Sequence, residues 1–211
     1  MIKNGYIIRS EKAEDYLKTE NLVREAFWNV YKPGCDEHYV LHCLRDDADF
    51  VPQLDFVMEK NGQIIGQIIF VKAAIRRDDG QALPVLTFGP VCIHPEYQGS
   101  GLGKILLDYA LEKAGEMGYG AVLIEGNINF YRRCGFTYAR EYGIRYHGLP
   151  EGADDSFFLC RQLKADYLTG ITGVYSTPQG YFAAVERPQE FEEYEKAFPQ
   201  KEKLKLPGQL V

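Results

Sequence analysis

The stretch VCIHPEYQGSGLGK, residues 91–104, decides the fold of this chain. Its first three residues are apolar and end a β-rich segment, and an amphipathic helical pattern follows it as far as Gly118. A strand, a glycine-rich turn and a helix N-terminus form an anion site, because unpaired N–H groups converge there and the helix dipole favours negative charge. Glycines let the backbone approach a phosphate closely. The stretch therefore predicts a phosphate-binding turn in an α/β fold.

Two familiar nucleotide-binding patterns fit this turn only in part. The glycines of residues 99–103 partly match the dinucleotide fingerprint G-x-G-x-x-G, and Glu125 stands near the place of its ribose-binding acid. The glycine spacing differs, however, and residues 94–98 separate the strand from the glycines. The P-loop pattern fails because Ile105 stands where Ser or Thr belongs and Gln98 stands where the first glycine belongs.

A third pattern fits every position. Gln98-x-x-Gly101-x-Gly103 resembles the Q/R-x-x-G-x-G/A pyrophosphate loop of the GNAT superfamily of acetyltransferases, and residues 91–97 resemble the strand and turn that enter it. Downstream, GNINFYRRCGF, residues 126–136, resembles the superfamily segment YY-x-R-F-G-F, with Cys134 in place of the usual Phe. The two elements occur in the expected order, and the resemblance covers roughly residues 6 to 163.

The resemblance implies an α/β fold with a mixed, mostly antiparallel sheet of about six or seven strands and helices on both faces. The strands ending near Ile93 and Glu125 would be central, parallel neighbours that splay apart to hold the pantetheine arm. Residues 1–164 would form the acetyltransferase domain. Residues 165–211 are expected to be a C-terminal extension, since a segment below about 50 residues rarely builds its own core.

Apolar periodicity and turn residues place the individual elements. Helices are predicted over residues 10–30, 36–44, 104–118, 129–134 and 188–198, and strands over 6–9, 54–58, 64–74, 83–93, 121–124 and 157–159. Lys60-Asn61-Gly62 predicts a hairpin between the second and third of these strands.

Acetyl-CoA is the acyl donor that the resemblance implies, with its pyrophosphate on the backbone N–H groups from Gln98 to Lys104. The complete set of expected coenzyme-binding residues is Val91, Cys92, Ile93, Gln98, Gly99, Ser100, Gly101, Leu102, Gly103, Lys104, Asn127, Phe130 and Tyr131.

Acetyl transfer to an amine needs a neutral amine, a stabilised oxyanion and a proton for the departing thiolate. Tyr131 occupies the position of the superfamily's general acid, and a phenol with a pKa of about 10 can protonate a thiolate whose conjugate acid is near 8.5; the alternative is that it only packs against the coenzyme. Glu125 is the candidate base, acting through water, or else a partly solvated carboxylate at a strand end. A backbone N–H near Cys92 or Ile93 would stabilise the oxyanion.

These assignments predict an N-acetyltransferase that acetylates a primary amine by direct attack. The amine belongs to a small molecule or a peptide, and specificity lies in side chains that the sequence does not identify. Because no obvious base stands on the strand before His94, an inactive module that binds and senses acyl-CoA is the alternative.

The face formed by Cys35, His38 and His42 has a spacing that zinc could use. No fourth ligand is obvious, so no metal is expected, and these residues are interpreted as structural or as lining of the amine site. The resemblance assigns the wall of that site to the first two helices, where Trp28, Tyr31 and Tyr39 also lie.

The amino-acid composition indicates which partners and which cellular compartment to expect. The net charge of −6, from 24 basic and 30 acidic residues, argues against nucleic acid or an anionic membrane as the main partner. Five widely spaced cysteines without a C-x-x-C motif indicate a reducing cytoplasm. No stretch approaches the roughly 20 apolar residues of a membrane span. A cytoplasmic protein is expected, and a homodimer is left open.

Overall fold

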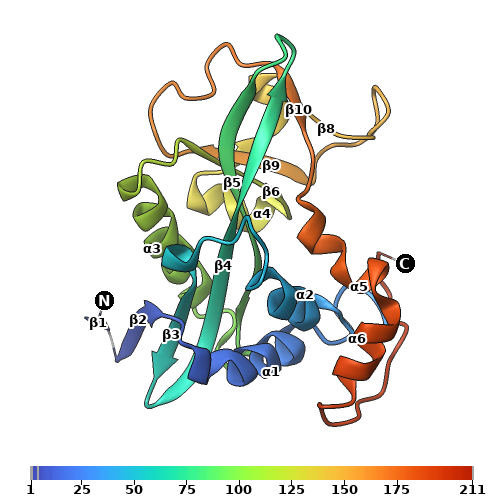
Figure 1. Ribbon diagram of the computed structural model, residues 1–211. Helices are drawn as coiled ribbons and strands as arrows, with labels where there is room; N and C mark the ends of the chain where they lie inside the picture. Colours follow the sequence, from blue (N-terminus) through green and yellow to red (C-terminus); the bar gives the residue numbers. More distant parts are fainter. Residues whose placement is uncertain (1, 4, 211) are drawn as a thin grey trace. The chain divides into compact units, whose positions relative to one another are not determined.

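The computed structural model describes residues 2–3 and 5–210, and their contacts separate into two units. The first unit takes the chain up to Ile69, then Gly89–Leu106, and then the chain from Gln179 onward. The second unit takes Phe70–Phe88 and Leu107–Pro178. Strands β4 and β5 and helix α3 each contribute residues to both units (Figure 1).

Antiparallel pairing builds the sheet of the first unit. Its strands are β1 (Ile2–Lys3), β2 (Tyr6–Ser10), β3 (Phe56–Lys60) and the first part of β4 (Gln63–Arg77), hydrogen-bonded in that order. Asn61 and Gly62 close the β3–β4 turn with φ of 52° and 80°, a conformation that asparagine and glycine tolerate best. The predicted hairpin at this position is confirmed.

Four helices belong to the first unit, and two of them come from the C-terminal extension. They are α1 (Tyr16–Phe27), α2 (Glu37–Leu44), α5 (Ala183–Glu186) and α6 (Pro188–Glu195), and Figure 1 shows α5 and α6 beside α2. Aromatic rings join them: the Tyr39 and Tyr194 centroids are 5.1 Å apart, and those of His38 and Phe198 also 5.1 Å. Such pairs add about 1 kcal/mol each beyond their buried area.

The second unit holds the later strands. In chain order its elements are the rest of β4, the first part of β5 (Ala82–Ile93), the later turns of α3 (Leu102–Glu116), β6 (Ala121–Glu125), α4 (Ile128–Tyr131), β7 (Thr137–Tyr138), β8 (Ile144–Tyr146), β9 (Phe158–Gln162) and β10 (Gly173–Tyr175). Hydrogen bonds connect β5, β6, β9 and β7 in that order, and β4, β10 and β8 in a second series. The β5–β6 and β8–β10 pairs are parallel.

Strand β6 lies between a parallel and an antiparallel neighbour. Its four apolar residues, Ala121 to Ile124, are buried, as the continuous apolar run predicts. The β5–β6 ladder consists of one described register pair, Leu86 opposite Val122, whereas β6 pairs with β9 along its whole length. The expected parallel pairing of these two strands is confirmed.

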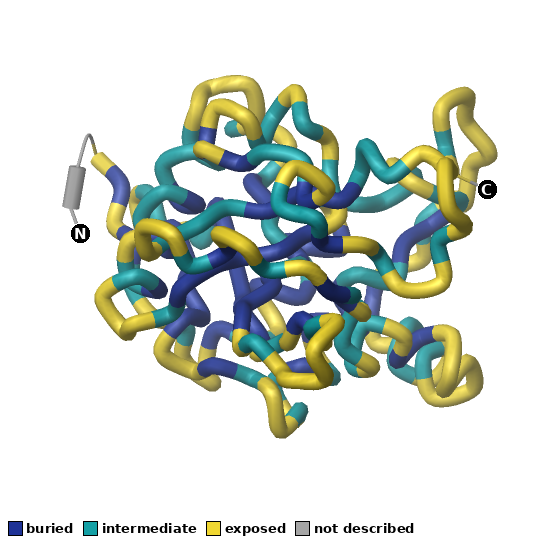
Figure 2. The backbone as a smooth tube through the Cα atoms, turned by 90° about the horizontal axis from the view of Figure 1, so that it is seen from above, coloured by how far each residue is buried: buried dark blue, intermediate teal, exposed yellow. Residues whose placement is uncertain are grey.

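The expected class, a mixed and mostly antiparallel α/β fold with a parallel pair, is confirmed, but the described residues form ten strands instead of six or seven. The strand predicted at residues 157–159 corresponds to β9, and a further strand, β10, follows it in the extension, where no strand was predicted. The three residues of β10 are too few to show the alternation of apolar and polar side chains that predicts a strand. Gly173 permits the close pairing, since a Cβ there would lie 2.5 Å from the carbonyl oxygen of Arg76. Figure 2 shows the buried stretches of backbone beside exposed turns, and Tyr175 is fully buried.

Candidate functional site

The glycine-rich turn of the first unit has the local geometry of an anion site. Strand β5 ends at Ile93, a single 3₁₀ turn covers Pro95–Tyr97, and α3 begins at Leu102. The His94 N–H donates to the Ile65 carbonyl at 2.8 Å, and the Gln98 side-chain amide donates to the Ile93 carbonyl at 2.9 Å. Both hydrogen bonds fix the direction in which the chain leaves the strand.

Two glycines give this turn its shape. Gly99 and Gly101 have φ of 72° and 83°, in the left-handed region, and a Cβ on either would meet no heavy atom within 4 Å. Glycine is therefore required here by backbone conformation and not by crowding. Among the described residues, no hydrogen-bond acceptor faces the backbone N–H groups of Gly99, Ser100 or Gly101. These donors, with the first N–H groups of α3, present positive ends to the solvent.

Cys92 lies within β5 and is buried. Burial raises the pKa of its thiol to about 12. A thiol in this state carries almost no thiolate at neutral pH, and the thiolate is the nucleophilic form. Cys92 is therefore a poor candidate for an acyl carrier.

The aromatic segment of the second unit is organised by two caps. Asn127 precedes α4, and its side-chain oxygen accepts from the Asn129 N–H at 2.9 Å. Gly135 ends the following 3₁₀ turn with φ of 79°. The Phe136 N–H then returns to the Tyr131 carbonyl at 3.2 Å. The departure from the superfamily pattern, Cys134, is 2% exposed, so the smaller side chain stands in a packed position as expected.

Neighbours on several sides fix the ring of Tyr131. Its centroid lies 4.9 Å from that of Phe130, 5.5 Å from Phe136 and 5.9 Å from Phe88. The ring also lies over Gly126, where a Cβ would be 2.9 Å from its Cδ2 and closer still to its Cε2. Any side chain at position 126 would displace the phenol, so glycine is required there by contact.

Glu125 ends β6, immediately before that glycine. Its carboxylate is exposed, and one oxygen accepts a hydrogen bond from the Thr177 hydroxyl at 2.6 Å. Thr177 belongs to the C-terminal extension, 52 positions further along the chain. The sequence pattern contains no sign of this contact.

The face proposed for zinc does not form. The Cys35 Sγ lies 3.6 Å from His38 Nδ1, but His38 Nε2 lies 2.7 Å from a Glu195 oxygen, and His42 faces Glu20 instead, at 3.1 Å. Burial lowers the pKa of His38 despite the carboxylate beside it. In the part of the chain that the structure describes, no group of three or more His, Cys, Asp or Glu residues could hold a metal ion.

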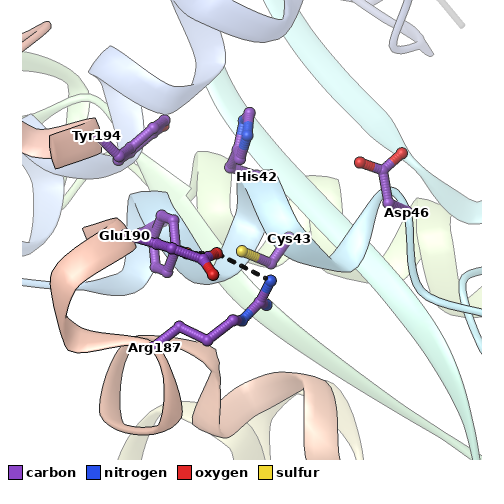
Figure 3. A pocket seen from close by; sticks show the side chains of 7 residues that line it. His42, Cys43, Asp46, Arg187, Glu190 and Tyr194 are labelled. Atoms are coloured by element: carbon purple, nitrogen blue, oxygen red, sulfur yellow. Dashed lines mark hydrogen bonds and ion pairs between the residues drawn. The ribbon is translucent and has the colours of Figure 1, made fainter.

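A pocket of the first unit lies where the C-terminal extension packs on α2. Its volume is about 260 Å³. Figure 3 shows the side chains that line it: Tyr39, His42, Cys43, Asp46, Arg187, Glu190 and Tyr194. The Tyr39 hydroxyl donates to Glu190 at 3.3 Å, and the Arg187 guanidinium lies 3.5 Å from the same carboxylate. Tyr39 and His42 were candidates for lining the amine site, whereas the residues from the extension had no signal in the sequence.

The other two candidates for that wall contact the C-terminal tail. The Trp28 indole N–H donates to the Glu202 carbonyl at 2.9 Å, and the Tyr31 carbonyl accepts from the Leu210 N–H at 2.8 Å. The tail thus runs along the segment that follows α1. No helix among residues 2–3 and 5–210 has both the length and the apolarity to cross a membrane.

The glycine turn, the aromatic segment and the parallel pair β5–β6 are the features by which the chain resembles acetyltransferases. Residues 11–136 match the Acetyltransferase (GNAT) family, and the chain belongs to this family. A curated relative is the uncharacterized N-acetyltransferase YhbS of Escherichia coli strain K12, which is 29% identical over 168 residues, covering 80% of this chain and 93% of the relative.

Two solved structures resemble the fold. The crystal structure of YhbS from Escherichia coli in complex with CoA has a TM-score of 0.72 and 27% identity, and the match covers 83% of this chain and 91% of that chain. A GNAT family acetyltransferase from Brucella melitensis, in complex with acetyl-CoA, has a TM-score of 0.65 and 22% identity, with 83% and 97% covered. The second likeness concerns the fold alone.

Proposed function

We propose that this chain transfers an acetyl group from acetyl-CoA to a primary amine by direct attack of the amine. Membership of the Acetyltransferase (GNAT) family supports the enzyme class, and the YhbS complex with CoA supports the acyl donor. The observation that carries the proposal is the exposed turn at residues 99–101. Gly99 and Gly101 have left-handed backbone there, and no acceptor among the described residues faces the N–H groups of Gly99, Ser100 and Gly101. Such a turn fits a pyrophosphate.

The resemblance assigns each coenzyme-binding residue a part. The N–H groups from Gln98 to Lys104 would bind the pyrophosphate, and the backbone of residues 91–93 would pair with the pantetheine as an added strand does. Asn127, Phe130 and Tyr131 would contact the remainder of the pantetheine. Because Asn127 already caps α4 with its side-chain oxygen, its side-chain NH₂ is the group left to donate.

The reaction forms a C–N bond and breaks the C–S bond of the thioester. The amine must first lose a proton, for which Glu125 is the proposed base. The nitrogen then attacks the carbonyl carbon, and a backbone N–H near Cys92 or Ile93 stabilises the oxyanion. Collapse expels the thiolate, which takes the phenolic proton of Tyr131. The nitrogen of the new amide loses its second proton to solvent, and solvent reprotonates the phenolate. The packing of Tyr131 against Phe88 and Phe136 supports this role, because a general acid must be held in one orientation.

A binding measurement tests the anion site first. In calorimetric titrations with acetyl-CoA, Gly101→Val should bind at least about tenfold more weakly than the wild type, because a β-branched residue cannot adopt φ of 83° without strain. Gly80→Val is the matched control: its φ is 85°, its Cβ would also meet open space, and it lies in the turn between β4 and β5. No binding of acetyl-CoA to the wild type would refute the proposal.

Release of free CoA, followed with a thiol reagent against a panel of primary amines, tests turnover. Tyr131→Phe should lower kcat about 100-fold while leaving the acetyl-CoA affinity within twofold, since only the proton donor is removed. Equal kcat values for variant and wild type would exclude Tyr131 as the acid. Binding of acetyl-CoA without turnover of any amine would favour the sensing module instead.

The proposal includes the cellular compartment. All five cysteines are free thiols in the structure, which supports a reducing, cytoplasmic compartment. The amine is proposed at the level of a class, a small-molecule or peptide primary amine, and a homodimer remains a prediction.

A further inference from the structure

Three polar side chains from different parts of the second unit meet at the end of β6. The Thr177 hydroxyl oxygen lies 2.6 Å from a Glu125 carboxylate oxygen and 2.7 Å from the Tyr146 hydroxyl oxygen. Parallel pairing of β8 with β10 creates this meeting, because it sets Tyr146 opposite Tyr175, two residues before Thr177. The close pairing at Gly173, which begins β10, fixes the strand in that register.

The two hydrogen bonds have a defined direction. An ionised carboxylate only accepts, so the single hydroxyl proton of Thr177 goes to Glu125. The Thr177 oxygen must then accept its second hydrogen bond from Tyr146. Burial raises the pKa of Tyr146, so this phenol keeps its proton at neutral pH and remains a donor. The chain of donors therefore ends on the Glu125 carboxylate.

We propose that Thr177 is a positioning residue for the general base Glu125, and that Tyr146 orients Thr177. This inference rests on the proposed acetyltransferase function and assigns a catalytic purpose to the C-terminal extension. The hydrogen bond holds Oε1 of Glu125, and the exposed carboxylate would take a proton from the ammonium group of the substrate, directly or through one water. An N–H bond of that ammonium breaks, the proton joins the carboxylate, and the neutral amine is released for attack; solvent later removes the proton.

Thr177 matters because it restricts the rotation of the Glu125 side chain. Glu125 is exposed at a strand end, and a glutamate side chain in such a place samples several rotamers. A base must lie within hydrogen-bond reach of the proton that it removes. One charge-assisted hydrogen bond from a threonine that is itself held by a tyrosine restricts that freedom.

The test compares four variants with the wild type, using kcat and kcat/KM over pH 5.5–9 and the acetyl-CoA Kd from calorimetry. Thr177→Val removes the donor and keeps the shape, and Thr177→Ser restores the hydroxyl. Thr169→Val is the matched control, because this exposed threonine of the extension lies 3.4 Å from the Asp166 carboxylate and outside the proposed site. Glu125→Gln removes the base itself.

Glu125→Gln should lower kcat about 100-fold, the usual contribution of a general base. Thr177→Val should lower kcat about tenfold while changing KM less than twofold, because the carboxylate loses the hydrogen bond that holds it in one orientation. Thr177→Ser should recover at least half of the wild-type kcat. Thr169→Val should match the wild type, and all variants should keep their acetyl-CoA affinity.

A Thr177→Val variant with the wild-type kcat, while Glu125→Gln is inactive, overturns the inference and leaves the proposed function intact. Wild-type turnover by Glu125→Gln refutes both the role of Glu125 as the base and the inference. Absence of acetyl-CoA binding by the wild type is the separate result that rejects the proposed function. Should Thr177→Val not fold, Tyr146→Phe replaces it: the loss of the second donor should lower kcat by a smaller factor, and an unchanged kcat overturns the inference.

Discussion

The buried carboxyl group of Asp55 should make the stability of this protein fall as pH rises. Asp55 is 4% exposed, and its carboxyl group shares a hydrogen bond with the carboxyl group of Glu11. Burial, then that hydrogen bond and the charge of Glu11, raise the pKa of Asp55 to about 9. Arg45 binds Glu11 through two hydrogen bonds, of 3.0 and 2.9 Å, so Glu11 is the anion and Asp55 carries the proton.

The size of the effect follows from proton linkage. An aspartate in the unfolded chain has a pKa of about 3.9, so between pH 5 and pH 8 the unfolded state has lost a proton that folded Asp55 keeps. The free energy of unfolding therefore falls by about 1.4 kcal/mol per pH unit from this group, or about 4 kcal/mol over the interval. The loss begins above the unfolded pKa and is complete above the folded pKa.

Asp55→Asn removes this titration and keeps the shape, because the amide can still donate to Glu11. The assay is urea unfolding of both proteins at pH 5, 6, 7 and 8. The free energy of unfolding of the variant minus that of the wild type should grow by about 1.4 kcal/mol for each pH unit from pH 5 to pH 8. Glu37, whose pKa burial raises to about 7, is common to both proteins and cancels in the difference. If the free energies of unfolding of the variant and the wild type changed in parallel with pH, the assignment of the proton to Asp55 would be refuted.

Three further predictions concern packing and chemistry. Gly126→Ala should lower kcat at least tenfold with little change in acetyl-CoA affinity, because the added Cβ would displace the ring of Tyr131. Steady-state kinetics measure kcat, and calorimetry measures the affinity. Glu195→Ala should destabilise the protein by about 3–5 kcal/mol in urea unfolding, since it leaves the guanidinium of Arg24, whose side chain is 2% exposed, without its 2.5 Å partner. Cys92→Ala should retain turnover and form no acyl-enzyme by intact mass spectrometry, since the thiol stays protonated.

Each of these predictions has its own control. Gly148→Ala, on a left-handed glycine with open space around it, reports the cost of an added Cβ without a neighbour; an equal kcat loss there would contradict the Tyr131 explanation. Glu192→Ala removes an exposed acid from α6 and should stay within about 0.5 kcal/mol of the wild type. Loss of turnover in Cys92→Ala with unchanged acetyl-CoA binding would reopen the covalent mechanism.

Much of the fold follows from local rules that the sequence displays. The period of apolar residues predicts α1, α2 and α3, and Asn61-Gly62 predicts the β3–β4 hairpin. The glycine turn was also predictable, because left-handed backbone at Gly101 requires glycine whatever surrounds it. These features depend on residues within one or two turns of chain, so the printed order of amino acids is sufficient to locate them.

Other features arise only when distant segments meet. Thr177 and Glu125 are 52 positions apart, and Arg24 and Glu195 are 171 apart. Nothing in the composition of the extension indicates that it would supply β10 to a sheet, a partner to the candidate base and three residues to a pocket. Strand register and helix packing determine hydrogen-bond partners of this kind. The spacing of residues along one segment carries no information about either.

The sequence by itself thus determined the family, the anion-binding turn and the aromatic segment, because backbone conformation and short-range spacing encode all three. The tertiary structure alone decided which side chains surround Glu125, why Gly126 must lack a side chain and which carboxyl group keeps its proton. The physical reason is that burial and contact are properties of the folded chain: the pKa of Asp55 and the place of the Tyr131 ring depend on atoms that only folding brings near.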